Sequence, residues 1–235
     1  MAQTQLIMGQ VAIYPDAEAV SRAAADYLRD QLIACVEQKG SCHIALPGGS
    51  TPARCLELLS GEDLPWKNIH AYLSDERCYP LGHPERNDSM IQQKLWSNID
   101  APPEHLHRIP AELGSEPAAE RYSDVINDIG QLDIALLGMG EDGHTASLFP
   151  GNAAMADNRA VVPVYHAPKV PADRVSLGLV TLQATDQRVV LVTGANKRDA
   201  MMQIEQGEPL PIVLIGAAHW FLDEAAAAGH VRHSQ

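Results

Sequence analysis

Short apolar runs alternate along the chain with longer segments in which apolar residues recur every three or four positions. The short runs are typical of strands covered on both faces, and the longer pattern is typical of helices that bury one face. The runs predict strands at Val11–Tyr14, His43–Leu46, Ile69–Leu73, Leu106–Ile109, Leu132–Leu137, Ala160–Tyr165, Arg174–Leu182, Arg188–Thr193 and Pro209–Ile215. The longer pattern predicts helices from Asp16 to Gly40, from about Ala53, from Glu85 to Leu95, and at Pro117–Ile129, Arg198–Gln206 and Trp220–Ala228.

Alternation of strands and helices over the whole length predicts the fold class. It favours an α/β fold with three layers, in which helices cover both faces of a mostly parallel, doubly wound sheet. No repeat or low-complexity linker divides the 235 residues, so we expect one domain over residues 1–235. Ligands of such sheets bind outside the carboxyl ends of the strands, and the loops after strands are therefore the candidates for function.

The loop after the strand Leu132–Leu137 combines glycines with groups that transfer protons: Gly138, Gly140, Asp142, Gly143 and His144. Glycines allow a close approach of the backbone to a ligand, while imidazole and carboxylate act in acid–base catalysis. The glycines also match the dinucleotide pattern G-x-G-x-x-G. Pro150 limits the following helix and no strand-end acid follows about 20 residues later, so that interpretation is disfavoured. A solvated or capping histidine is the plainer alternative.

A second glycine loop, Pro47–Pro52, follows another predicted strand and precedes a helix. The backbone of Gly48 and Gly49 and the hydroxyls of Ser50 and Thr51 are suited to bind a phosphate group at a helix N-terminus. The G-K-[ST] ending of a Walker loop is absent. An ordinary glycine-rich turn, with the two hydroxyls as helix caps, is the alternative.

Charged residues follow two further strands. Asp75 is expected to face the glycine loops, and Arg77 can bind a phosphate with its planar fork, although a solvated turn fits both. Lys197 follows a strand and is either a phosphate ligand or a solvated lysine. Asn87 and Asp88 are expected to cap a helix, with Asp16 as a further cap and His43 as a structural residue.

Charge and cysteine content narrow the class of protein. The chain has 17 basic and 30 acidic residues and a net charge of −13, which disfavours nucleic acid and anionic membranes as partners. An anionic substrate would therefore need a local cluster of cations. No run approaches 18 apolar residues, the first residues do not resemble a secretory signal, and the four cysteines form no C-x-x-C pair. We expect reduced thiols and a cytoplasmic location.

Four motifs in order along the chain resemble the 6-phosphogluconolactonases: LPGGSTP from Leu46, SDER followed by ERND from Ser74, GMGEDGHTASLFPG from Gly138, and RVSLGLVTL from Arg174. The resemblance implies the sheet of the glucosamine-6-phosphate deaminases and ribose-5-phosphate isomerases. It also implies hydrolysis of 6-phosphoglucono-δ-lactone to 6-phosphogluconate in the pentose phosphate pathway, with no cofactor. Gly178 departs from the family pattern, since we expect a threonine or a bulkier residue there.

The resemblance and the residue chemistry together suggest roles. We expect His144 to be the general base, oriented by Asp142 or Asp75, with backbone N–H groups of Gly48 and Gly49, or of Gly140, binding the oxyanion. The 6-phosphate is expected to bind a set formed by Arg77, Arg174, Lys197, Ser50 and Thr51.

Three alternatives remain open at this point. In the related deaminases a glutamate stands where this chain has Phe149, so a deaminase is the first relative to exclude. A sugar-phosphate sensor without turnover is the second. A metal at the aspartates and His144 is the third, but no ligand pattern such as H-E-x-x-H supports it, and we expect no metal. The expected partner is a small sugar-phosphate lactone, and the chain is expected to be a monomer or a small homo-oligomer.

Overall fold

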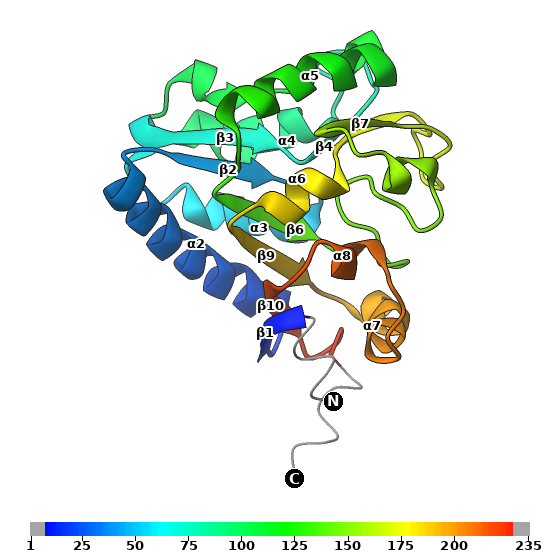
Figure 1. Cartoon of the computed structure of the whole chain (residues 1–235). Coiled ribbons are helices and arrows are strands. Elements are labelled where there is room, and N and C mark those ends of the chain that lie inside the picture. Colours follow the sequence, from blue (N-terminus) through cyan, green and yellow to red (C-terminus); the bar gives the residue numbers. More distant parts are fainter. Residues whose placement is uncertain (1–7, 228–235) are drawn as a thin grey trace.

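The computed structural model describes residues 8–227 and contains two sheets. The main sheet has seven strands in the order β1-β10-β9-β6-β2-β3-β5, and every neighbouring pair is parallel. Figure 1 shows it as the centre of the molecule. The strands are β1 (Gly9–Tyr14), β2 (Cys42–Leu46), β3 (Ile69–Leu73), β5 (Leu106–His107), β6 (Ile134–Gly138), β9 (Gln187–Val192) and β10 (Ala218–Asp223).

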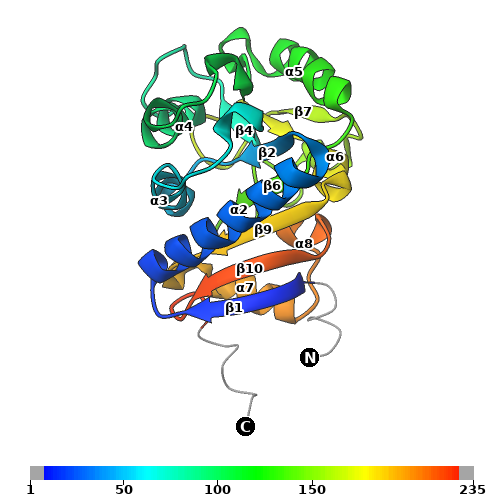
Figure 2. The same ribbon diagram turned by 90° about the vertical axis from the view of Figure 1, so that its left-hand side faces the viewer.

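Helices lie on both faces of this sheet, as predicted. Figure 2 places α3 and α4 on one side of the strands and α6 and α8 on the other. The longest helix, α2, packs along α3 and β10 and begins just after Asp16, whose side chain accepts a hydrogen bond from Ala19 N as the predicted cap. The helices are α2 (Ala17–Lys39), α3 (Ser50–Leu59), α4 (Asn87–Lys94), α5 (Ser115–Ile129), α6 (Leu179–Ala184), α7 (Arg198–Glu205) and α8 (Pro211–Leu214).

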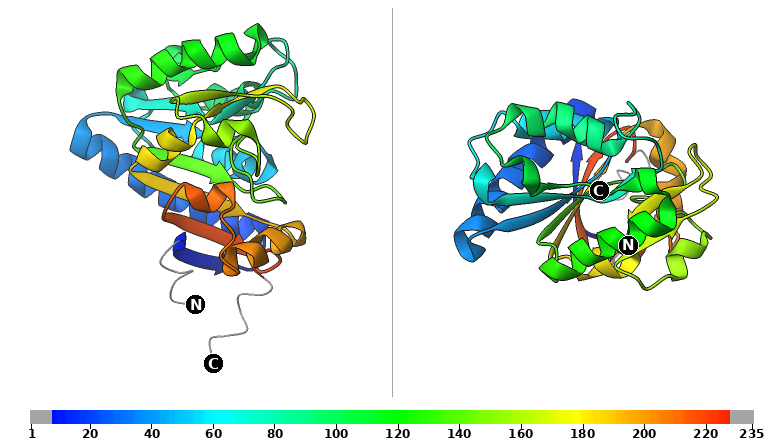
Figure 3. Two further views of the ribbon diagram at one scale, coloured as in Figure 1. Left: turned by 45° about the vertical axis from the view of Figure 1, so that its right-hand side comes forward. Right: turned by 90° about the horizontal axis from the view of Figure 1, so that it is seen from above.

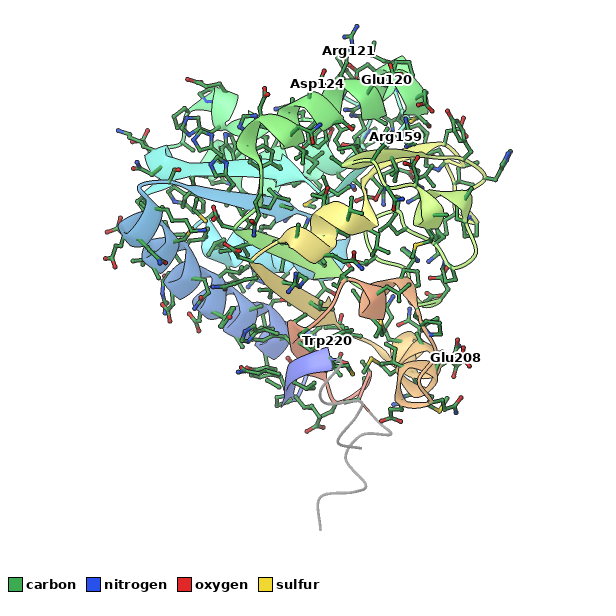
Figure 4. The ribbon with its side chains drawn as sticks, viewed as in Figure 1. Glu120, Arg121, Asp124, Arg159, Glu208 and Trp220 are labelled. Atoms are coloured by element: carbon green, nitrogen blue, oxygen red, sulfur yellow. The ribbon has the colours of Figure 1, made fainter. Side chains whose placement is uncertain are left out.

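A three-stranded antiparallel sheet adds a smaller layer beside the main one. Its strands are β4 (Asp75–Arg77), β8 (Arg174–Leu177) and β7 (Val161–Val164), in the order β4-β8-β7. Helix α5 packs on β7 and β8, and the left view of Figure 3 shows the helix above these strands. Glu120, Arg121 and Asp124 point outward from α5 (Figure 4), as expected for a helix with one buried face.

Three predicted elements differ from the structure. Residues Pro209–Ile215 do not form a strand, because Pro211 cannot donate to a sheet ladder and is accommodated instead in the first turn of α8. The predicted helix Trp220–Ala228 is the strand β10, which places Trp220, Phe221 and Leu222 between β1 and β9; residue 228 lies outside the described range. The Trp220 indole donates to Met8 O (2.7 Å) and joins β10 to the start of β1 (Figure 4).

The third difference concerns the segment Arg174–Leu182, which is a strand only up to Leu177. At Gly178 a Cβ atom would overlap the carbonyl oxygen of Arg159, so the departure from the family pattern has a steric cause. The backbone of Gly178 approaches Ala160 closely, with Gly178 N donating to Ala160 O (2.8 Å), and α6 begins one residue later. The glycine therefore ends β8 and allows β7 and α6 to meet.

The order of the strands fixes the place of the site. From β2 the chain builds outward through β3 to β5, then returns to β6 on the other side of β2 and continues through β9 to β10. The reversal occurs between β2 and β6, and at such a point the loops after the two strands diverge to open a crevice. The two glycine loops predicted to be functional are these two loops, after Leu46 and after Gly138.

Candidate active site

A cavity of about 460 Å³ lies at this reversal point, at the carboxyl ends of the strands. It collects residues from the loops after β2, β3, β6 and β9, together with the loop before β8. The residues predicted for the site that line it are Gly48, Gly49, Ser50, Thr51, Asp75, Arg77, Gly140, His144, Arg174 and Lys197. Asp142 lines a neighbouring cavity instead and reaches the site through His144.

His144 and Asp142 form a hydrogen-bonded pair. Nδ1 of His144 lies 2.5 Å from Oδ1 of Asp142, which also accepts the backbone N–H of His144 (3.2 Å). Because an ionised carboxylate only accepts, Nδ1 carries a proton, and in the neutral imidazole Nε2 is then the nitrogen with the lone pair. Burial raises the pKa of Asp142, but the hydrogen bond and charge of His144 outweigh it and lower the pKa to about 2. Asp142 therefore stays ionised at neutral pH.

Glycines shape the loop that carries this pair. A Cβ atom at Gly140 would overlap Nδ1 of His144, and Gly143 has φ +77° and would overlap Leu210 if it carried a side chain. The N–H of Gly140 donates to His144 O (2.8 Å), which closes the loop. This bond corrects one prediction: Gly140 already has an acceptor for its N–H, so it does not offer that group to an oxyanion.

Asp75 has a different set of partners. Its carboxylate accepts from Ser147 Oγ (2.6 Å) and from Asn87 Nδ2 (3.0 Å), and it is 5% exposed. Asn87 Nδ2 also donates to the Asp75 carbonyl (2.8 Å). Of the two carboxylates predicted to orient His144, the structure thus places Asp142 on the imidazole, whereas Asp75 joins the loops after β3 and β6.

The sequence predicted that Asn87 and Asp88 cap helix α4, but neither side chain does so. The backbone N–H groups of both residues instead donate to the carboxylate of Glu76, each over 2.8 Å, so a residue distant in sequence caps α4. This arrangement frees the Asn87 side chain to line the cavity. A Cβ atom at Gly48 would overlap Oδ1 of Asn87, so the glycine lets the first loop lie directly against α4.

The first glycine loop presents donors to the cavity. Gly49 has φ +99° and precedes α3, and within residues 8–227 the N–H groups of Gly48 and Gly49 have no hydrogen-bond partner. Thr51 Oγ1 lies 2.6 Å from Thr193 Oγ1, which follows β9, so the two loops meet through their hydroxyls. The free N–H groups and the helix N-terminus together favour an anion here.

Four cations line the cavity: Arg77, Lys169, Arg174 and Lys197. Among the described residues, none of them forms an ion pair with a carboxylate. Arg77 donates to Glu85 O, while its buried Nε has no partner. Burial lowers the pKa of Arg174 and of Lys197, which is the cost of holding a charge away from water. An anionic ligand would offset that cost, although the chain as a whole is acidic.

Lys169 is a site residue that the sequence did not reveal, because it lies in a proline-rich loop without periodicity. The guanidinium of Arg174 donates to the carbonyls of Pro171 (3.1 Å), Lys169 (3.1 Å) and Val170 (3.3 Å). It also lies over the Phe149 ring, 5.5 Å from the centroid. Arg174 thus holds the loop that brings Lys169 to the cavity.

Sequence comparison agrees with this geometry. The sequence profile of the family described as glucosamine-6-phosphate isomerases/6-phosphogluconolactonase matches residues 15–222. The chain belongs to this family. It is 32% identical over 235 residues to the 6-phosphogluconolactonase of Nostoc sp., an alignment that covers 93% of this chain and 97% of that protein.

Solved structures of the family have the same fold. The 6-phosphogluconolactonase of Thermotoga maritima superposes with a TM-score of 0.85 at 28% identity and covers 91% of this chain and 99% of its own. A monomeric glucosamine-6-phosphate deaminase superposes with a TM-score of 0.81 at 21% identity, covering 93% and 99%. The predicted deaminase-like sheet is therefore confirmed.

Within residues 8–227, no helix combines the length and apolar character needed to cross a bilayer.

Proposed function

We propose that this chain hydrolyses 6-phosphoglucono-1,5-lactone to 6-phosphogluconate, the lactonase step of the oxidative pentose phosphate pathway. The observation that carries the proposal is the joint placement of a proton-accepting imidazole and four unpaired cations around one cavity. The imidazole suits attack of water on an ester carbonyl, and the cations suit the phosphate of the same substrate. The family relatives that carry the name of this activity support it.

The phosphate end of the substrate would bind to the cations. Lys169 comes from the loop before β8, Arg174 opens β8 itself, Lys197 follows β9, and Arg77 comes from β4. Their charges attract a dianion that the net charge of the whole chain repels. Thr51 and Ser50, at the N-terminus of α3, add hydroxyl donors to the lining of the same cavity.

At the lactone end, His144 would act as general base. Its Nε2 takes a proton from water while the water oxygen attacks C1, and Asp142 stabilises the imidazolium that forms. The free N–H groups of Gly48 and Gly49 are the donors available for the developing oxyanion. The imidazolium then gives its proton to the ring oxygen as the C1–O bond breaks. A δ-lactone is an activated ester, so this route uses neither a covalent nucleophile nor a metal.

Phe149 favours the lactonase over the related deaminase reaction. The centroid of its ring lies 4.4 Å from the centroid of the His144 ring, and the side chain is almost fully buried. The deaminases that resemble this chain carry a glutamate at this position. Ring opening and isomerisation of an amino sugar move protons at several atoms, whereas hydrolysis needs one activated water. The candidate site supplies one imidazole–carboxylate pair, which matches the simpler reaction.

The chain is also proposed to work in the following setting. It acts as a single domain over residues 1–235, in the cytoplasm, as a monomer or small homo-oligomer, with a small phosphorylated lactone as its partner. The excess of acidic over basic residues supports the exclusion of nucleic acid as a partner.

The direct test is an assay in which glucose-6-phosphate dehydrogenase generates the lactone and its disappearance is followed with and without the purified chain. The expected result is a rate well above spontaneous hydrolysis, with no ammonia released from glucosamine 6-phosphate in a parallel sample. Ammonia release without lactonase activity would support the deaminase alternative. A thermal shift with 6-phosphogluconate but no acceleration would support a sensor.

A further inference from the structure

Two cysteines and an aspartate meet at the end of the main sheet opposite the candidate active site. Cys35 lies near the end of α2, Cys42 opens β2, and Asp133 immediately precedes β6 (Figure 1). The two sulfur atoms and a carboxylate oxygen of Asp133 all lie within 4.8 Å of one another. Both cysteines are free thiols, Cys42 buried and Cys35 partly buried. The strands β2 and β6 are sheet neighbours, so this contact follows from the topology.

Gln187 is a neighbour of Asp133, because its backbone N–H donates to Asp133 O (2.9 Å). A small cavity of about 100 Å³ is lined by Cys35, Asp133 and Gln187, among other residues. The side-chain oxygen Oε1 of Gln187 is buried and has no hydrogen-bond partner. A buried acceptor without a partner costs about 1–3 kcal/mol, so such an atom marks a place where a donor or a cation is expected.

We propose that Cys35, Cys42 and Asp133 bind a thiophilic divalent cation, with Zn²⁺ as the reference ion and Gln187 Oε1 or a water as the fourth ligand. Two thiolates and a carboxylate form a donor set that zinc accepts in tetrahedral sites. Metal–ligand bonds of about 2.0–2.3 Å place ligand atoms on one zinc roughly 3.5–4 Å apart. The present spacing therefore requires side-chain adjustments of about an ångström.

The charge around the cluster fits this ion. Lys39 forms ion pairs with Asp133 and with Asp186 (2.8 Å), and the His43 N–H donates to the second oxygen of Asp133 (2.7 Å). Without a bound cation, the carboxylates of Asp133 and Asp186 and the ammonium group of Lys39 together carry a net charge of −1. Burial raises the pKa of both thiols, so both are protonated at neutral pH. The His43 ring, whose pKa is lowered by burial, contributes no positive charge at that pH.

Binding is then an exchange of one cation for two protons. Both S–H bonds break, two sulfur–metal bonds form, and the two protons pass to solvent, so the net charge of the cluster is unchanged. No oxidant or reductant takes part.

The site would join the end of α2 to the amino ends of β2 and β6, while the candidate active site lies at the carboxyl ends of the same strands. A cation bound there stabilises the folded chain by mass action and leaves the chemistry at His144 untouched. The expected function is structural, and the inference does not depend on the proposed lactonase activity.

The test uses the full chain, stripped of metal and kept reduced with a phosphine. Titration with Co²⁺ should give one equivalent of a near-ultraviolet sulfur-to-cobalt band that Zn²⁺ abolishes. The band should disappear in Cys35→Ser and Asp133→Asn and persist in the matched variant Cys78→Ser, whose thiol lies elsewhere. Absence of the band, or its persistence in Cys35→Ser, would overturn the proposal.

A measurement on the unaltered chain covers the case in which a variant does not fold. Zn²⁺ should protect Cys35 from alkylation by iodoacetamide, read peptide by peptide in a mass spectrometer, and leave the partly buried Cys78 as reactive as before. Equal reactivity of Cys35 with and without Zn²⁺ would also overturn the proposed metal site.

Discussion

Oδ1 of Asp142 accepts a hydrogen bond from Nδ1 of His144 over 2.5 Å, although the two residues are only two positions apart in one loop. A local turn, with glycines at 140 and 143, is therefore enough to build the pair. Its consequence is that the imidazole has a fixed tautomer, with Nε2 free to accept a proton.

Replacing Asp142 by Asn should lower kcat about a hundredfold and leave KM nearly unchanged. The amide removes the negative charge that stabilises the imidazolium and can donate to Nδ1, which favours the wrong tautomer. Steady-state rates on the phosphorylated lactone measure the effect. Asp157→Asn, on an aspartate that pairs with Arg159 away from the cavity, is the matched control. A normal kcat in Asp142→Asn would show that the pair does not orient the base.

Removing the charge of Lys197 should weaken binding and spare the chemical step. A hydrogen bond to a charged group contributes about 1.5–3 kcal/mol, so Lys197→Ala is expected to raise KM for the phosphorylated lactone about 10- to 100-fold. Lys67→Ala, on an exposed lysine that pairs with Asp100, should leave KM unchanged. If KM stayed the same in Lys197→Ala, the residue would not belong to the phosphate site.

Gly178 is predicted to be required for folding stability. Because a Cβ atom there would overlap Arg159 O, Gly178→Ala should lower the free energy of unfolding by about 1–3 kcal/mol, the usual range for overpacking. Gly61→Ala, at an exposed position with ordinary contacts, should change it by less than about 0.5 kcal/mol. Urea denaturation measures the free energy of unfolding of both variants. Equal values would show that the Cβ atom at position 178 does not clash with Arg159 O.

A stack of histidines predicts how stability depends on pH. His70 lies 3.8 Å from His105 and 5.1 Å from His43 between ring centroids. Burial, followed by the charges of His105, His43 and His107, lowers the pKa of His70 from 6.5 to about 4. Folding therefore favours the neutral ring. This contribution to stability is complete above pH 6.5 and is lost as the pH falls through about 4.

Melting temperatures measured between these two pH values test this prediction. His70→Phe keeps an aromatic ring without a charge, so its melting temperature should fall less on acidification than that of the unaltered chain. His166→Phe, on an exposed imidazole, should fall as much as the unaltered chain. Identical pH profiles for all three proteins would contradict the role of the stack.

The parts of the site that the sequence predicted lie, apart from Arg174 at the start of β8, in segments that follow an apolar strand. Gly48, Asp75 and His144 all follow such runs, and the sheet rule brings them together. Lys169 and Asn87 were not predicted as site residues, because tertiary contacts with Arg174 and Asp75 position them. Contacts between segments that are distant in sequence leave no periodic pattern from which these residues could have been predicted.

The errors in the fold have a similar origin. The alanines after Asp223 favour a helix, yet Trp220 and Leu222 pack between two parallel strands, and this tertiary burial outweighs local preference. The same applies to Gly178, where the close approach of the β7 segment, and not the local pattern, ends the strand.

The most direct test of the account is kcat for 6-phosphoglucono-δ-lactone in His144→Ala, corrected for spontaneous hydrolysis and compared with His83→Ala. His83 is an imidazole outside the cavity that stacks on Tyr79. Loss of the general base should lower kcat between about 10²- and 10⁴-fold in His144→Ala, while His83→Ala should keep the rate of the unaltered chain. A near-normal kcat in His144→Ala would contradict the central claim that this imidazole activates the water.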